Sequence, residues 1–239
     1  LFRADAKPSI GTGDLVSLIC LSKAFKRNGW DVCFAVRDYD ASRGILLQYQ
    51  VSADLLMAKD LSVEDEISAI NEYCLSHGVT HFFACITQWT LARYVALDAS
   101  VKKGCINNDG IVPPNWDLVV NWNFPDKNKY PRKNFPKTHF LTGLEYVTLP
   151  ESFDNEIIRQ RLYCRPIKRL LVSIGGADAH NLTTDIARKL LEESIDLHVT
   201  FILGAGFRGH EALNAVLKSA GFAYECKVAV ENMFLEYLN

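Results

Sequence analysis

The chain has 239 residues, enough for one large or two small domains, and 49% of them are hydrophobic. Its 26 Lys and Arg residues nearly balance its 28 Asp and Glu residues, which argues against a strongly basic surface for nucleic acid. No apolar run approaches the ~20 residues of a membrane-spanning helix, and no N-terminal segment has the pattern of a signal peptide. We therefore expect neither nucleic acid nor a membrane span among its partners.

The cysteines and histidines give no sign of a disulfide framework or a metal site. The 7 cysteines are scattered and odd in number, and none forms a CxxC pair. Most lie in apolar runs, where a thiol packs as a small hydrophobic group. A reducing cytoplasm is the simplest location for such a chain. The 6 histidines show no ligand spacing, so we predict no metal and no cofactor.

The N-terminal half alternates short apolar runs with helical patterns, and Ser62 with Asp65 resembles a capping box. Such βαβα alternation predicts a parallel sheet covered by helices. In chain order we predict a strand at 1–3, a helix at 14–27, a strand at 30–36, a less distinct helix and strand within 46–58, a helix at 63–77, a strand at 81–86, a helix at 90–100, and strands at 104–107 and 118–121.

Residues 122–140 are rich in Pro, Lys and Asn, with aromatic residues between them. This pattern superficially resembles a nucleic-acid-binding loop. A long solvated connection held by anchoring aromatic side chains is the better interpretation.

The remaining chain reads as a second α/β unit, with few strands for a domain of this class. We expect the sequence to be truncated, or its end to be unobserved. The predicted organisation is an N-terminal Rossmann-like domain (1–145), a linker (146–167) and a C-terminal nucleotide-binding domain (168–239). The elements predicted here are strand 168–174, helix 182–193, strand 198–204, helix 211–218, strand 224–230 and the start of a final helix.

Glycine-rich turns join strands to helices at 11–13, 175–178 and 204–206. Glycine there tolerates positive φ and exposes N–H groups beside a helix N-terminus, which suits the phosphate of a nucleotide or nucleotide-sugar. A tight turn needs glycine just as often. None of the turns completes GxGxxG and no Walker motif is present, which disfavours NAD enzymes and P-loop NTPases. Asp14, directly after the first turn, is either a helix N-cap or a carboxylate facing a ligand cleft.

Several motifs resemble, in serial order, those of the UDP-sugar hydrolases of the pseudaminic acid pathway and the related spore-coat polysaccharide proteins. The family opens with R-x-D and I-G-x-G-H, followed by a helix and a strand. The matching stretches here are FRADAKPSIGTGDLVSLICLSKAFKRNGWDVCFAVR, INNDG with DLVVNWN, LTGLEYVTLPESF, LLVSIGGADAHNLTTDIARKL and VENMFLEYLN.

The resemblance implies two Rossmann-like domains in the glycosyltransferase-B arrangement, and hydrolysis at the anomeric carbon of a UDP-linked 2,4-diacetamido-2,4,6-trideoxy sugar. The implied partners are a UDP-sugar or another nucleotide-sugar, and enzymes of the pathway. Matching the motifs residue by residue gives the implied substrate-binding residues Arg3, Asp5, Gly11, Gly13, Asn121, Asn123, Gly175, Gly176, Asp178 and Asn181.

The histidine that follows the first glycines in the family, its expected general base, is Asp14 here. A carboxylate can activate water at an anomeric carbon, as in inverting glycosidases, and we name Asp14 as the candidate catalytic residue. It can equally deprotonate a sugar hydroxyl, which would make the protein a glycosyltransferase. A non-catalytic nucleotide-sugar-binding protein is the other alternative, and an NAD-linked reductase ranks last.

Overall fold

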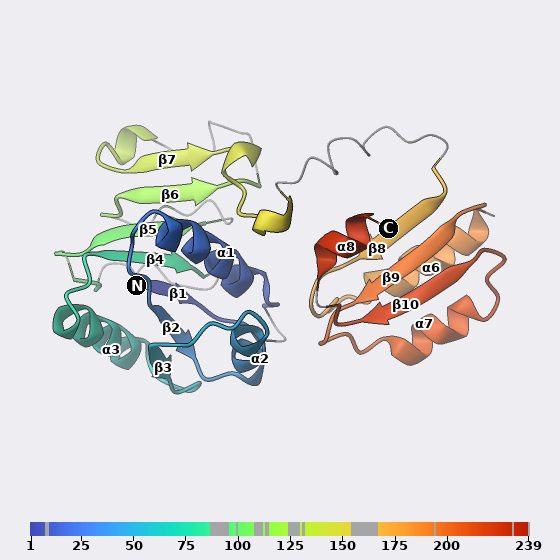
Figure 1. Cartoon of the computed structure of the whole chain (residues 1–239), viewed down its shortest axis with the longest axis horizontal. Helices are drawn as coiled ribbons and strands as arrows, with labels where there is room; N and C mark the ends of the chain where they lie inside the picture. Colours follow the sequence, from blue (N-terminus) through green and yellow to red (C-terminus); the bar gives the residue numbers. More distant parts are fainter. Residues whose placement is uncertain are drawn as a thin grey trace. The chain divides into compact units, whose positions relative to one another are not determined.

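The computed structural model describes residues 1–7, 10–86, 96–98, 100–107, 112, 115–123, 130, 132–153, 167–193, 195–230 and 232–238. The chain divides into two compact units, Leu1–Leu149 and Pro150–Asn239 (Figure 1). Among the helices of the described residues, none combines the length and apolar character needed to cross a membrane.

The first unit is built on a parallel sheet of 7 strands in the order β3-β2-β1-β4-β5-β6-β7. The chain starts in the middle of this sheet, at β1, and the strand order reverses between β1 and β4. The strands are β1 (Phe2–Ala4), β2 (Phe34–Arg37), β3 (Leu55–Met57), β4 (His81–Cys85), β5 (Lys102–Ile106), β6 (Leu118–Asn121) and β7 (His139–Thr142).

Helices cover both faces of this sheet, as the alternation in the sequence predicts. α1 and α2 contribute Leu15, Leu18 and Leu46 to one apolar cluster, and α3 contributes Ile67 and Ile70 to the cluster on the other face. The bounds are α1 (Gly13–Arg27), α2 (Asp40–Gln48) and α3 (Val63–Ser76), with short 3-10 helices at Arg132–Asn134, Leu144–Tyr146 and Glu151–Phe153.

Local signals located most of these elements. Ser62 caps α3 by accepting a hydrogen bond from the Asp65 N–H at 3.1 Å, as the capping-box pattern predicts. The strand predicted at 30–36 is shorter at its start, because pairing with β1 begins at Phe34. Most of the helix predicted at 90–100 lies outside the described residues.

Residues 122–140 were predicted to be a solvated connection, and this was wrong for the last two residues. They begin β7, which pairs in parallel with β6. The strand is only 4 residues long and carries no alternating pattern, so its pairing with β6 is what defines it. Tyr130, within the same segment, is 3% exposed, which confirms that an aromatic side chain anchors it.

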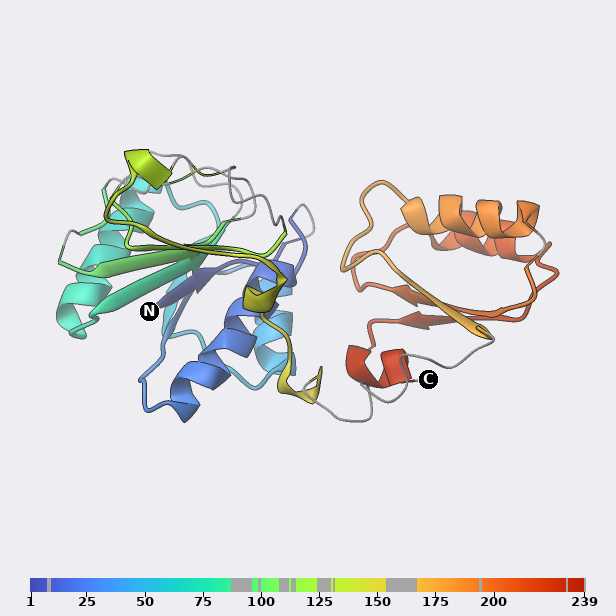
Figure 2. The same cartoon turned by 90° about the horizontal axis from the view of Figure 1, so that it is seen from above.

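The second unit has a parallel sheet of 3 strands in the order β10-β9-β8. α6 and α7 cover one face of it, and Val172, Phe201 and Leu213 belong to the core between them (Figure 2). All its predicted elements are present, as β8 (Arg169–Ser173), α6 (Leu182–Glu192), β9 (His198–Leu203), α7 (His210–Leu217), β10 (Tyr224–Val228) and α8 (Met233–Leu238).

A buried group of four charges links β1, β2 and α3 in the first unit. The Arg3 guanidinium is fully buried and donates to both carboxylate oxygens of Asp5, at 2.6 and 2.7 Å. Its Nε donates to Glu66 at 3.0 Å. Burial by itself lowers the pKa of Arg3, but the two carboxylates outweigh it and raise that pKa.

Arg37 completes the group from β2. Its backbone N–H donates to Asp5 at 2.7 Å, and its side chain is hydrogen-bonded and ion-paired to Glu66. The remaining guanidinium donors reach the carbonyls of Lys59 and Leu61 at 2.8 and 2.9 Å. Two cations and two anions therefore balance inside the protein. Removing one leaves an uncompensated buried charge.

We expect Glu66→Gln to lower the free energy of unfolding by about 3 kcal/mol, because both arginines then lose a buried anionic partner. Urea unfolding measures this change. Glu64→Gln is the matched control, since Glu64 is exposed in the same first turn of α3 and should cost less than about 0.5 kcal/mol. Equal effects of the two substitutions would contradict a stabilising role for the buried group.

Candidate functional site

The carboxyl ends of parallel strands, at the point where the strand order reverses, are where open α/β sheets bind ligands. In the first unit this point lies between β1 and β4. The turn after β1 closes on itself, because the Gly11 N–H donates to the Lys7 carbonyl at 2.8 Å and the Lys7 N–H donates back at 3.2 Å. Gly11 has φ +80°, a backbone conformation that favours glycine.

Asp14 lies in the first turn of α1 but does not cap it. The helix begins at Gly13, and its N-cap is Thr12, which makes no side-chain capping hydrogen bond. The N-cap interpretation of Asp14 is therefore wrong. The charge of the Asp14 carboxylate acts on the thiol of Cys85, the last residue of β4, while the helix dipole favours a negative charge at this end.

Cys85 is 2% exposed. Burial, and then the charge of Asp14, raise the pKa of the Cys85 thiol well above its ordinary value. The thiol therefore keeps its proton at neutral pH. Sequence reasoning missed this residue as a neighbour of Asp14, because nothing in the apolar run around it distinguishes it from a packing cysteine.

Arg3 and Asp5, predicted to bind substrate, lie in the buried charge group at the carboxyl end of β1. The Arg3 side chain donates hydrogen bonds to Asp5 and Glu66. What these two residues do in this structure is fix the strand from which the glycine turn starts.

Asn121 and Asn123 lie at the carboxyl end of β6. The Asn121 side chain is fully buried; its Nδ2 donates to the Tyr130 hydroxyl at 2.6 Å and its Oδ1 accepts from the Asn123 N–H at 2.9 Å. The Tyr130 hydroxyl donates to the Asn107 carbonyl at 3.1 Å. Asn121 therefore joins the ends of β5 and β6 to the following segment, whereas Asn123 is exposed.

In the second unit, two glycine turns pack against each other. The Gly206 N–H donates to the Gly176 carbonyl at 2.9 Å, and a Cβ at Gly204 would overlap that same carbonyl group. Glycine at 204 is therefore required by this close backbone contact. Gly175 has φ +77° and open space around its Cβ position.

Asp178 is the residue that caps α6. Its two carboxylate oxygens accept from the N–H groups of Leu182 and Thr183 at 2.8 and 2.9 Å. Burial by itself raises the pKa of Asp178, but these N–H groups, with a smaller contribution from His180, hold it below its ordinary value. Asn181 has φ 54° and accepts from the Thr184 hydroxyl at 2.7 Å. Both predicted binding residues thus shape the start of α6.

We expect Asp178→Ala to lower the free energy of unfolding of this unit by about 1 kcal/mol, because α6 loses its cap. The folded-state pKa lies below the ordinary value of 3.8, so the stabilisation is complete at neutral pH and is lost as pH falls through the folded-state value. Urea unfolding at pH 7 and pH 3 measures both effects. Asp185→Ala is the control, because Asp185 is a surface residue in the first turn of α6. An equal loss of unfolding free energy in this variant would contradict the capping role of Asp178.

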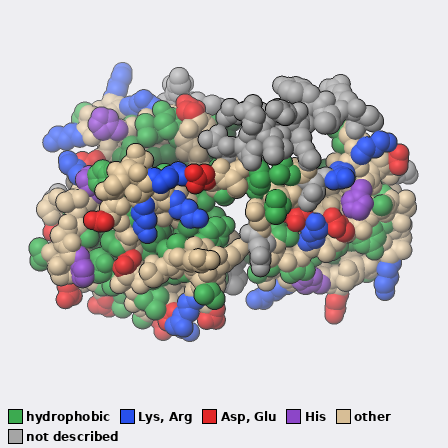
Figure 3. Space-filling model, viewed as in Figure 1, with side chains coloured by type: hydrophobic (Ala, Val, Ile, Leu, Met, Phe, Trp, Pro, Cys, Tyr) green, Lys and Arg blue, Asp and Glu red, His purple; other side chains and the backbone are tan. Residues whose placement is uncertain are grey.

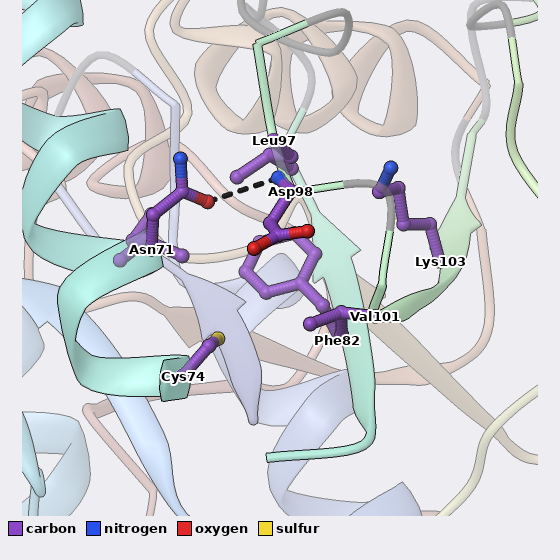
Figure 4. Close-up of a pocket in the computed structure, with 8 residues that line it drawn as sticks. Asn71, Cys74, Phe82, Leu97, Asp98, Val101 and Lys103 are labelled. Carbon is purple, nitrogen blue, oxygen red and sulfur yellow. Dashed lines mark hydrogen bonds between the residues drawn. The ribbon is translucent and has the colours of Figure 1, made fainter. Parts of the chain in front are cut away.

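Two hollows lie away from these turns. A cavity of about 10 Å³ between α3 and β4–β5 is lined by Asn71, Phe82, Asp98 and Lys103 (Figure 4), which is room for about one water molecule. Burial lowers the pKa of Lys103 there, against the opposing charges of Asp117 and Asp98.

A groove of about 440 Å³ runs over the second sheet and is lined by polar side chains that include Arg169, His198 and Glu225. On the visible face of each described unit, Lys and Arg side chains are interspersed with Asp and Glu (Figure 3). Within the described ranges, no group of His, Cys, Asp and Glu side chains is placed to hold a metal ion.

The two-unit α/β fold matches the glycosyltransferase-B-like fold of MurG and of UDP-GlcNAc 2-epimerases, which confirms the fold class predicted from the sequence. MurG of Acinetobacter baumannii superposes with a TM-score of 0.61 at 13% identity, over 99% of this chain and 70% of MurG. The UDP-GlcNAc 2-epimerase of Neisseria meningitidis, bound to UDP-GlcNAc, superposes with a TM-score of 0.58 at 11% identity, over 99% of this chain and 74% of the epimerase. The UDP-GlcNAc 2-epimerase of Methanocaldococcus jannaschii superposes with a TM-score of 0.59 at 13% identity, over 99% of this chain and 76% of the epimerase.

No protein-family model matches the chain. An uncharacterised protein of Methanocaldococcus jannaschii is 30% identical over 125 residues, which are 49% of this chain and 25% of that protein. The chain therefore matches about a quarter of the length of this curated relative.

Proposed function

We propose that this chain processes a UDP-linked sugar. The observation that carries the proposal is the agreement of nearly the whole chain, 97–99%, with the fold of MurG and of several UDP-GlcNAc 2-epimerases. One of these epimerases is bound to UDP-GlcNAc, and the MnaA protein of Staphylococcus aureus, with the same fold, is bound to UDP.

Gly13 supports a ligand beside the first turn. A Cβ there would meet no atom within 4 Å, and its φ is not positive. Neither packing against the described residues nor backbone conformation therefore accounts for glycine at this position. Close approach of a ligand to the backbone at the N-terminus of α1 is a physical reason that remains.

The reaction we propose is hydrolysis at the anomeric carbon, by analogy with the UDP-sugar hydrolases that the sequence resembles. The Asp14 carboxylate takes a proton from water, the water oxygen bonds to the anomeric carbon, and the bond from that carbon to the UDP oxygen breaks with its electron pair leaving on UDP. The products are UDP and the free sugar. Gly11, Gly175 and Gly176 offer further backbone positions for the nucleotide part.

A glycosyltransferase is the second candidate. In it, Asp14 would deprotonate a sugar hydroxyl in place of water, with the same bond to UDP breaking. The two reactions differ in whether UDP appears without an added acceptor.

Asp14→Asn should lower kcat for UDP release from a UDP-linked 2,4-diacetamido-2,4,6-trideoxy sugar by about a hundredfold or more, because an amide cannot accept the proton. The assay measures free UDP from the full-length protein. Asp40→Asn is the matched control: Asp40 is an exposed carboxylate in the first turn of α2, and its loss should leave kcat unchanged. Tight UDP-sugar binding without any UDP release would overturn the hydrolase and leave the transferase or a binding protein.

Gly13→Ala should raise KM for the UDP-sugar roughly tenfold, because the added methyl group occupies the space we assign to the ligand. The protein itself should be slightly more stable, since glycine is a poor helix residue. Gly44→Ala provides the control, because Gly44 lies exposed in α2 with nothing within 4 Å of its Cβ position. An unchanged KM in Gly13→Ala would contradict the proposal that the ligand contacts this turn.

A further inference from the structure

The second sheet carries rows of polar side chains on the face that α6 and α7 do not cover. These two helices pack over one face, and α8 lies on the other (Figure 2). Side chains alternate between the two faces along each strand, so the parallel register places three rows on the side of α8. The rows are Arg169 with His198, then Leu171, Thr200 and Glu225, and then Ser173, Ile202 and Lys227.

The first two rows form the floor of the groove of about 440 Å³, and α8 contributes Glu236 to its lining. Small-molecule sites have volumes in this range. Arg169 and His198 are the first residues of β8 and β9, whereas the turns at Gly175 and Gly204 follow the carboxyl ends of the same strands. The groove is therefore a separate place from the glycine turns of this unit.

The acidic side chains of the groove already have partners. The Lys227 ammonium lies 2.7 Å from the Glu236 carboxylate and 3.4 Å from the Glu225 carboxylate. The Thr200 hydroxyl also donates to Glu225, at 2.9 Å.

The basic side chains at the other end of the groove are not paired in this way. Arg169 and Lys168 are exposed, and among the described residues neither side chain makes an ion pair or a hydrogen bond. Their positive charge is therefore left over at the amino end of β8. An anionic group complements this end of the groove, because a guanidinium binds carboxylate or phosphate through two parallel hydrogen bonds.

We propose that this groove binds a small hydroxylated anion, either a sugar acid or a sugar phosphate. Arg169 binds the carboxylate or phosphate. The remaining lone pairs of Glu225 and Thr200 accept hydrogen bonds from the hydroxyl groups of the ligand, and Leu171 offers an apolar surface to its ring carbons. No bond is made or broken here, and the proposal does not depend on the reaction proposed above.

Titration calorimetry of the whole chain at constant ionic strength tests the ligand class. We expect D-glucuronate and D-glucose 6-phosphate to bind about tenfold more tightly than D-glucose, which lacks the charge, and than acetate, which lacks the hydroxyl groups. The tighter of the two sugar anions identifies the anionic group as a carboxylate or a phosphate. Equal binding of glucose or acetate, or binding of a tri-glutamate peptide alone, would overturn the proposal.

Arg169→Gln should weaken the binding of D-glucuronate or D-glucose 6-phosphate about tenfold, because the ligand loses a charge-assisted hydrogen-bond partner. Arg188→Gln is the matched control, since it removes the same charge from an exposed position on α6, where Arg188 pairs with Asp185. Its binding should be unchanged. An equal loss in both variants would show unspecific attraction of anions and contradict the assigned site.

Saturating UDP separates this groove from the site proposed for the nucleotide-sugar. The affinity for D-glucuronate should be the same with and without UDP, because the groove and the glycine turns lie at opposite ends of β8 and β9. Displacement of D-glucuronate by UDP would place the anion at the turns and overturn the inference. A chain that binds D-glucuronate but neither binds UDP nor releases it from a UDP-sugar would contradict the proposed function and leave this inference standing.

Discussion

The first unit depends on the neutral group of Arg3, Asp5, Arg37 and Glu66. Four charges removed from water are costly to bury, and they are tolerated because every one faces an opposite charge. The group ties α3 to β1 and β2, and through the Arg37 N–H it holds Asp5 in place. Asp5 lies at the carboxyl end of β1, where the glycine turn begins. The position of that turn, and of α1 after it, therefore follows from a buried electrostatic balance.

The two units use similar sequence patterns for different purposes. In each, an acidic residue follows the glycines after a strand. Asp178 accepts hydrogen bonds from the first N–H groups of α6, so its carboxylate occupies that helix end. Asp14 leaves the capping position to Thr12, and its charge acts on the thiol of Cys85. The carboxylate of the second unit thus shapes a loop, whereas that of the first unit does not cap its helix and is the general base we propose.

The glycines divide in the same way. Gly204 is fixed by the close approach of the Gly176 carbonyl, and Gly11 and Gly175 by positive φ. These requirements come from the protein itself. Gly13 has none of them among the described residues, and neither has Gly44 in α2, so the ligand we propose at Gly13 rests also on its place at the N-terminus of α1. A glycine that close packing or a positive φ already requires gives no information about a ligand.

The sequence by itself determined the fold class and most helices and strands, because the spacing of apolar residues and the cap at Ser62 are local signals. It also located the turns on which the proposed site is built. Tertiary structure decided what no local pattern carries. β7 exists through its pairing with β6. Arg3 meets Glu66 across 63 residues of chain and so belongs to a buried charge group. The charge of Asp14 acts on Cys85 only because β4 lies beside β1. Hydrogen bonds between distant residues depend on the order of strands in a sheet, and strand order follows from the packing of the whole unit.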